Sequence, residues 1–128
     1  MRVLKTRTFA RWSRKERILD SALAAAVDEM RRGLVDAQLG AGLVKKRIAR
    51  AGAGKSGGYR TLIATNLRDR WVFLYGFAKN ERDNVDDQEL SKLKMLAQTF
   101  LGMSDETIEP LVKAGELTEI KHGEPKAS

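Results

Sequence analysis

The sequence lacks cysteine entirely and contains a single histidine, His122. Without cysteine, disulfide bonds, thiolate metal sites and cysteine nucleophiles are excluded. A closed zinc site would need an unusual all-carboxylate ligand set, and one histidine close to the C-terminus disfavours a Ser-His-Asp triad. We therefore expect a protein that uses neither a metal ion nor a cofactor.

Long apolar runs are missing as well. No stretch approaches the roughly 18–20 apolar residues that a membrane span requires, and the N-terminal residues have no features of a secretory signal. A chain of 128 residues that is 42% hydrophobic has room for one domain around one core. We expect a cytoplasmic protein without membrane contact. Residues 1–120 should form the domain, with 104–120 as a C-terminal extension and 121–128 as a disordered tail.

Charge is plentiful but unevenly distributed. Residues 1–82 contain 19 Lys and Arg against 7 Asp and Glu, a balance of +12, whereas residues 83–128 contain 5 against 10, a balance of −5. A basic body attracts phosphates through counterion release and electrostatic steering. A merely solubilising surface can show the same asymmetry, so the charge supports nucleic-acid contact but does not indicate cleavage.

Helical periodicity is clearest in two segments. Apolar residues recur at helical spacing over 18–30, and Gly33 follows as a terminating residue. Asp86 and Glu89 have the spacing of a capping box before a second helix that we expect to end near Gly102. Shorter helical stretches are expected around Phe9 and Trp12 and from Ser104, where Pro110 indicates either a kink or a later start near Glu109.

Extended segments precede, separate and follow these helices. Strands are predicted over residues 1–5, at a sheet edge, and over 43–50, 59–66, 71–79 and 117–120. Ala51–Gly58 is too rich in glycine for regular structure and should be a flexible loop. The order β-α-α-β-β-β-α, followed by the extension, predicts an α+β domain. Its antiparallel-rich, twisted sheet should have about four strands, with helices packed on one face.

The segment Gly54-Lys55-Ser56 superficially suggests a nucleotide-binding P-loop. That motif needs a glycine five positions before Gly54, where this sequence has Ala49, and it leads into a helix rather than a strand. ATP or GTP binding is therefore disfavoured, although Lys55 and neighbouring backbone N–H groups can still hold a phosphate.

The strands over 59–66 and 71–79 should form an antiparallel hairpin. If four residues form its loop, so that Asn66 pairs with Trp71, then Arg60 lies opposite Phe77. Arg60 and Lys79 then emerge on one face as diagonal neighbours, about 7–8 Å apart at Cα. A five-residue loop would place them on opposite faces.

Cations that converge near aromatic rings suit a phosphodiester with unstacked bases. Besides Arg60 and Lys79, the candidates for RNA contact are Lys45, Lys46, Arg47, Arg50, Lys55, Tyr75 and Arg82. The alternative is structural: strands often end in solvated cations, the aromatic residues can belong to the core, and the basic cluster can extend over apolar surface.

Four blocks resemble the RelE/HigB-like toxins of bacterial type II toxin–antitoxin systems. They are Lys45–Arg50, Gly54–Arg60, Phe73–Asn80 and Asn84-Val85. The resemblance spans nearly the whole chain and implies a small RelE-like domain that acts on messenger RNA, usually within the ribosome. Arg60 and Lys79 match functional positions of the family. The tyrosine that some relatives place after the last strand has no counterpart just beyond Lys79.

The resemblance further implies a metal-independent endoribonuclease that inhibits translation and depends on the ribosome. An antitoxin from the same operon, of the helix-turn-helix type, should hold the toxin inactive. We expect a monomeric free toxin and an oligomeric toxin–antitoxin complex. Two alternatives stay open: a non-cleaving, ParE-like inhibitor of DNA gyrase, and a simple basic nucleic-acid-binding module.

Overall fold

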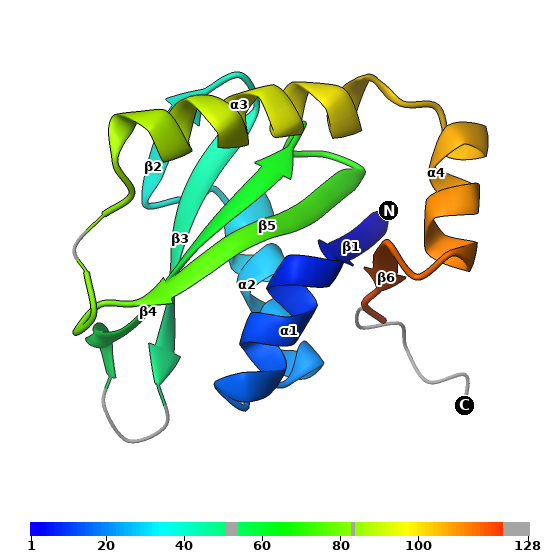
Figure 1. Ribbon diagram of the computed structural model, residues 1–128. Helices are drawn as coiled ribbons and strands as arrows, with labels where there is room; N and C mark the ends of the chain where they lie inside the picture. Colours follow the sequence, from blue (N-terminus) through cyan, green and yellow to red (C-terminus); the bar gives the residue numbers. More distant parts are fainter. Residues whose placement is uncertain (51–53, 83, 122–128) are drawn as a thin grey trace.

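The computed structural model describes the backbone of residues 1–50, 54–82 and 84–121, and the side chains of these residues except 50 and 54–57. Two pairs of consecutive helices, α1–α2 and α3–α4, interrupt the strands along the chain (Figure 1). Their bounds are β1 (Arg2–Thr6), α1 (Arg7–Lys15), α2 (Asp20–Arg31), β2 (Ala37–Gly40), β3 (Leu43–Arg50), β4 (Gly54–Thr65), β5 (Arg70–Ala78), α3 (Asp87–Gly102), α4 (Asp105–Lys113) and β6 (Leu117–Glu119).

The strands form one sheet in the order β2-β3-β4-β5-β1-β6. All described pairings are antiparallel except β1 with β5, so the predicted α+β class with an antiparallel-rich sheet is confirmed. The sheet has six strands rather than about four. The prediction missed β2, a four-residue strand without β-branched residues. It also placed the first strand at an edge, whereas β1 lies between β5 and β6.

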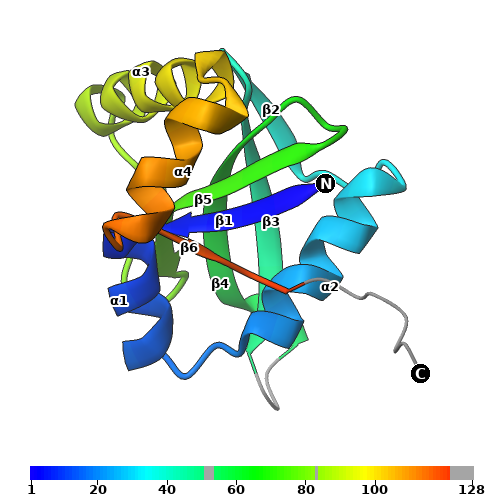
Figure 2. The same ribbon diagram turned by 90° about the vertical axis from the view of Figure 1, so that its right-hand side faces the viewer.

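Helices cover both faces of the sheet, and the prediction of one covered face was wrong. Apolar residues of α1 and α2 pack in one core cluster, and those of α3 and α4 pack in a second cluster on the opposite face. Figure 2 shows α2 and the α3–α4 pair on opposite sides of the strands. The sequence carried a sign of this arrangement, because β5 is a nearly continuous apolar and aromatic run, RWVFLYGFA, as is typical of strands covered on both faces.

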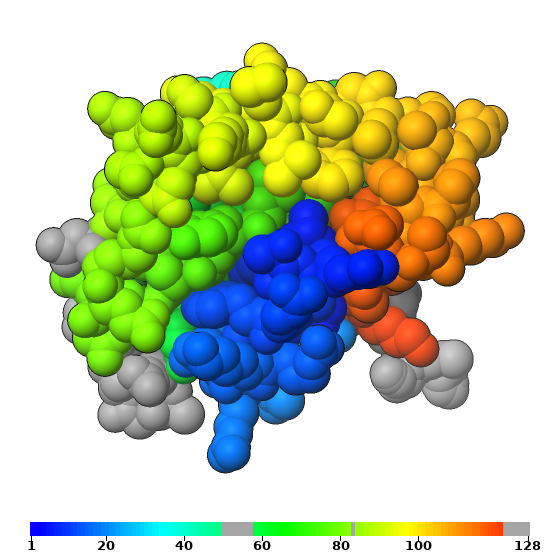
Figure 3. Space-filling view, viewed as in Figure 1, coloured from blue at the N-terminus to red at the C-terminus, as the bar shows by residue number. Residues whose placement is uncertain are grey.

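The C-terminal extension adds a strand to the sheet, as predicted for residues 117–120. β6 pairs with β1, and Ile108 of α4 is fully buried in the second cluster. Arg70 joins the hairpin to this region by donating to the backbone carbonyls of Phe100 and Met103 and to Asp105 Oδ1 at 2.7 Å. In Figure 3 the orange and red surfaces of α4 and β6 lie directly against the blue surface of α1.

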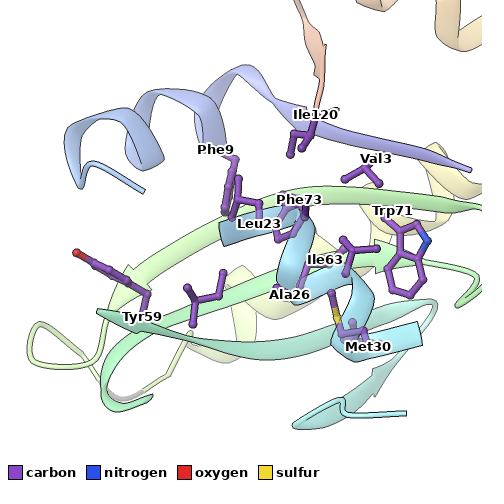
Figure 4. Packing of buried hydrophobic residues seen from close by; sticks show 14 of the residues in the cluster. Val3, Phe9, Leu23, Ala26, Met30, Tyr59, Ile63, Trp71, Phe73 and Ile120 are labelled. Atoms are coloured by element: carbon purple, nitrogen blue, oxygen red, sulfur yellow. The ribbon is translucent and has the colours of Figure 1, made fainter. Parts of the chain in front are cut away.

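Aromatic side chains fill the first cluster, between the sheet and helices α1 and α2. Phe9 of α1 meets Phe73 of β5 with ring centroids 5.1 Å apart, and Trp12 meets Tyr59 edge-on at 5.5 Å. Figure 4 shows Phe9 pointing from α1 toward Leu23 of α2 and Phe73. The short helical stretch around Phe9 and Trp12 is thus confirmed, with its aromatic side inward.

The predicted helix ends are largely confirmed. Asp86 and Glu89 form a reciprocal capping box at the start of α3, and Gly33, with φ +92°, follows α2. α4 begins after its N-cap Ser104 and continues through Pro110, so a start near Glu109 is wrong.

The glycine-rich segment is partly strand, in contrast to the predicted loop. β4 begins at Gly54, and Gly54 pairs with Arg50 of β3. Residues 51–53 lie outside the described residues, as do residues 122–128, on which most of the predicted disordered tail falls.

Candidate nucleic-acid interface

The register of the β4–β5 hairpin decides which side chains share a face. Arg60 pairs with Phe77, as predicted, and Leu62 pairs with Tyr75. Nearer the loop the prediction fails, because Trp71 pairs with Thr65 rather than with Asn66. The register shifts by one residue between these two regions.

A β-bulge produces this shift. Leu62 faces Tyr75 whereas Ile63 faces Phe73, so Leu74 is the extra residue on β5. The connection from Thr65 to Trp71 contains five residues, 66–70, which alone would have reversed the predicted faces. The bulge reverses them once more. Beyond the bulge, away from the loop, the side chains therefore lie on the faces that were predicted.

Lys79 continues the hairpin just beyond β5. Its backbone N–H donates to the carbonyl of Gly58 at 3.1 Å, and Gly58 lies two residues before Arg60. Alternation along the strands therefore assigns position 79 to the face of Arg60. Lys79 is exposed, whereas Arg60 is only 8% exposed.

A row of cations crosses this face of the sheet. Arg47 of β3 lies directly opposite Arg60 of β4, and Lys45 lies one step away opposite Leu62. Asp36 completes a pocket with Lys45, Arg47 and Arg60. Its carboxylate accepts from the backbone N–H of Arg47 at 2.6 Å and from Arg47 Nε at 3.1 Å, which holds Arg47 in place beside the pocket.

Helix α3 buries only part of the same face. The second core cluster includes Leu43, Ala64 and Val72 together with Phe100 of α3. These strand residues lie toward one end of β3, β4 and β5. Toward the other end, past Leu62, Arg47 and Arg60 occupy this face of β3 and β4, with Phe77 of β5 directly opposite Arg60. The face is therefore divided into an apolar half beneath α3 and a cationic half.

Tyr75 and its neighbours border the cationic half. Arg82 Nη1 donates to Tyr75 Oη at 3.1 Å, and Arg82 Nη2 donates to Glu89 Oε1 at 2.5 Å. The Arg82 guanidinium also lies 5.6 Å from the ring centroid of Phe77. The ion pair lowers the pKa of the Glu89 carboxyl, assisted by the Asp86 backbone N–H, and raises the pKa of Arg82. Tyr75 is thereby anchored to the start of α3.

Lys46 lies on the opposite face and does not fit the RNA contact predicted for it. It is only 3% exposed, because its position on β3 directs it toward α2. Its Nζ lies 2.7 Å from Glu29 Oε1 and donates to the carbonyl of Leu34 at 2.8 Å. A cation held in this way is a structural element of the fold.

The remaining predicted contacts divide between described and undescribed side chains. Those of Arg50 and Lys55 lie outside the described residues. Arg82 is described, but its donors are engaged by Glu89, Tyr75 and the carbonyl of Asn84. Asp36 was not predicted as part of the site, because no pattern in the sequence gave a signal for it. Glu89 was predicted only as a helix cap.

Within the described part of the chain, no three His, Cys, Asp or Glu residues come together as a set of metal ligands. No helix among these residues has the length and apolar character needed to cross a bilayer.

Comparison with known proteins gives one family. The sequence matches a protein-family model described as the RelE toxin of the RelE/RelB toxin–antitoxin system, over residues 1–120. No curated protein matches the chain.

Proposed function

Because the chain belongs to the RelE toxin family, we propose that it is a metal-independent endoribonuclease that cuts messenger RNA on the ribosome and thereby inhibits translation. Toxins of this family pair with a RelB antitoxin. We place the activity in the cytoplasm, and we assign the cationic half of the sheet face, with Arg60 and Lys79, as the catalytic surface.

The observation that carries this proposal is the direct opposition of Arg47 and Arg60 on neighbouring strands. Like charges in this position repel one another and destabilise a sheet. Asp36 offsets part of the charge of Arg47. A phosphate bound in the pocket would bring further negative charge to the two arginines and would accept hydrogen bonds from guanidinium groups in fixed geometry.

RNA supplies its own nucleophile for the reaction. The 2′-oxygen forms a bond to the adjacent phosphorus as the bond from phosphorus to the 5′-oxygen breaks, which leaves a 2′,3′-cyclic phosphate and a 5′-hydroxyl. A proton must leave the 2′-hydroxyl and another must reach the 5′-oxygen, while negative charge accumulates on the phosphorane. Arg60 stabilises that charge, since a guanidinium remains protonated throughout the reaction.

Lys79 and Tyr75 act on either side of this centre. Lys79 adds a second positive charge at the same face, where it contacts the phosphorane or the neighbouring phosphate. Tyr75 contacts a base, and its hydroxyl is held by Arg82. We therefore assign Arg82 a positioning role through Tyr75, because its guanidinium donors are occupied within the protein. Weak cleavage of free RNA is expected, since the ribosome orients the substrate.

Regulation follows from pairing with the antitoxin. We propose a helix-turn-helix antitoxin encoded beside the toxin, a monomeric free toxin and an oligomeric complex. A simple observation tests the first part, because a short helix-turn-helix reading frame should lie next to the toxin gene.

The decisive experiment is to induce the protein in cells and map transcript 5′ ends at single-nucleotide resolution. We expect in-frame cuts that disappear in an Arg60→Ala, Lys79→Ala double variant, since loss of one charge-stabilising group alone slows such reactions by roughly 10²–10³-fold. The matched control is Arg68→Ala, Lys92→Ala, which removes the same charges from exposed positions elsewhere and should leave the cuts intact. Unchanged transcripts with arrested replication would refute the proposal and indicate gyrase inhibition.

A further inference from the structure

A second pocket lies where α1 crosses the edge of β5. β1 pairs with β5 only from Arg70 to Phe73, so among the described strands none flanks that edge beyond Phe73. Helix α1 occupies this place instead, and in Figure 3 its blue surface borders the green surface of β5. A pocket of about 310 Å³ remains between the two elements.

Gly76 determines the inner wall of this pocket. A Cβ atom at that position would lie 2.2 Å from Cζ3 of Trp12, so the indole packs directly against the backbone of β5. Tyr75, the preceding residue, lines the same pocket. Phe9 lines it as well, so three aromatic side chains surround the pocket: Phe9 is fully buried, whereas Trp12 and Tyr75 are half-buried.

The outer wall is cationic. Thr8, Arg11 and Lys15 line the pocket from one stripe of α1, as expected for residues spaced three or four apart on a helix. Both cations are exposed, and no carboxylate of the described residues lies within salt-bridge distance of either. They differ in this respect from Lys46 and Arg82, whose charges are matched within the protein.

Tyr75 connects this pocket to the cationic half of the sheet face. Tyr75 lines the pocket beside α1, while its hydroxyl accepts from Arg82, which also pairs with Glu89. An RNA strand that runs from the Arg60 pocket across Tyr75 thus reaches Trp12, Arg11 and Lys15. Aromatic rings beside unmatched cations are the features that bind successive nucleotides of a single strand.

We propose that the pocket between α1 and β5 binds a nucleotide of the RNA strand that flanks the scissile phosphate. Its base stacks on Trp12 and its phosphates contact Arg11 and Lys15. This inference rests on the proposed function, because it extends the path of the same RNA strand. A protein ligand is less suited to the site, since a small pocket with two unmatched cations matches a nucleotide in size and charge.

Nuclear magnetic resonance of the ¹⁵N-labelled full chain tests the inference directly. The protein has two tryptophans, and a Trp12→Phe variant assigns their indole N–H signals. The probe is a single-stranded RNA hexamer with 2′-O-methyl groups throughout, which lacks the nucleophile and therefore stays uncut. We expect the Trp12 signal to move on titration. The Trp71 signal should stay, since Trp71 is fully buried and its Nε1–H donates to the carbonyl of Arg68.

Charge variants provide the second arm. Arg11→Ala, Lys15→Ala should weaken hexamer binding about tenfold at low salt and reduce the salt dependence of log K by roughly 0.7 for each phosphate that the variant no longer binds. The matched control, Arg14→Ala, Lys92→Ala, changes one arginine and one lysine at exposed positions outside the pocket and should bind as the wild type does.

The possible outcomes separate this inference from the proposed function. If amide signals around Arg60 move while Trp12 does not, the pocket proposal is overturned and the catalytic surface stands. If neither region responds to RNA, both proposals are overturned. If the Arg11, Lys15 variant binds the hexamer normally but loses affinity for the antitoxin, the pocket is a protein-docking site and the inference is wrong.

Discussion

Lys46 and Arg47 are neighbours in sequence and carry the same charge, yet the fold gives them opposite surroundings. The side chain of Lys46 is 4% exposed and paired with Glu29 of α2, whereas that of Arg47 is 45% exposed and lies beside Arg60. Alternation along β3 separates them, because successive side chains of a strand point to opposite faces. Basic residues that follow one another on a strand thus fall into two sets, one directed toward α2 and one toward the opposite face of the sheet.

The same contrast extends across the sheet. On the α2 side, the ammonium of Lys46 is matched at close range by Glu29 and serves packing. On the other side, Arg47 lies opposite a second arginine, Arg60, and shares its pocket with the carboxylate of Asp36. Lys46 therefore stabilises the folded protein, whereas Arg47 and Arg60 lie where we propose that an anion binds.

Of the variants that test this contrast, the largest effect is expected from a change at Lys46, which lowers the stability of the folded protein. Replacing Lys46 with Met removes the ammonium from the Glu29 carboxylate and should lower the free energy of unfolding by about 2–3 kcal/mol. This is less than for a fully buried pair, because Glu29 is partly exposed. Urea denaturation measures the loss, while RNA binding by the folded fraction should stay normal. The double variant Lys46→Met, Glu29→Leu should recover most of the stability. A stable Lys46→Met protein that no longer binds RNA would contradict the assignment.

An intermediate effect, now on binding, is expected at Arg47. Arg47→Ala should weaken binding of the uncut RNA hexamer several-fold and reduce the salt dependence of log K by roughly 0.7. Its free energy of unfolding should change by less than about 1 kcal/mol, because Arg47 and Asp36 form an exposed ion pair. Arg68→Ala, at an exposed loop position, is the control. Should Arg47→Ala unfold as readily as Lys46→Met, the two faces would not differ in the way described.

The smallest effect is expected at the Arg82–Glu89 pair, which is intermediate in exposure between Lys46 and Arg47. Because folding lowers the pKa of Glu89, the pair stabilises the folded protein to its full extent at pH values above the pKa of glutamate in the unfolded chain, about 4.3. The contribution is lost as the pH falls through the lower folded value. The free energy of unfolding should therefore fall less steeply below about pH 5 in Glu89→Gln than in the wild type. Denaturation series across this range measure the slopes, with exposed Glu81→Gln as control; identical slopes in all three proteins would exclude the pair as a source of acid sensitivity.

The sequence predicted the local features of the fold well, because local chemistry dictates them. The capping box of Asp86 and Glu89 and the terminating Gly33 are examples. The pairing of Arg60 with Phe77 was also predicted, although through an assumed loop that the structure does not have. The predicted pairing was correct because two deviations, the five-residue connection and the bulge at Leu74, cancel each other.

The features that sequence could not predict depend on tertiary packing. Alternation along 43–50 predicts that Lys46 and Arg47 point to opposite faces, but the pairing of Lys46 with Glu29 arises only when α2 packs against β3. Likewise, the pocket beside Trp12 requires that β1 stop pairing at Phe73 and that α1 fill the vacated edge. Asp36 joins the site only because it packs beside β3, although it lies between α2 and β2 in an otherwise featureless segment.

The bulge at Leu74 has a consequence for how this hairpin can vary. The five-residue connection and the bulge each shift the register of the hairpin by one residue. Either shift alone would turn every later residue of β5 to the opposite face, and together they cancel. Removing one residue from 66–70 while keeping the bulge would turn Phe77 and position 79 toward α2. Inserting or deleting two residues in this connection leaves the side chains on the same faces. Whether the connection has an odd or an even number of residues thus determines whether Arg60 and position 79 lie on one face.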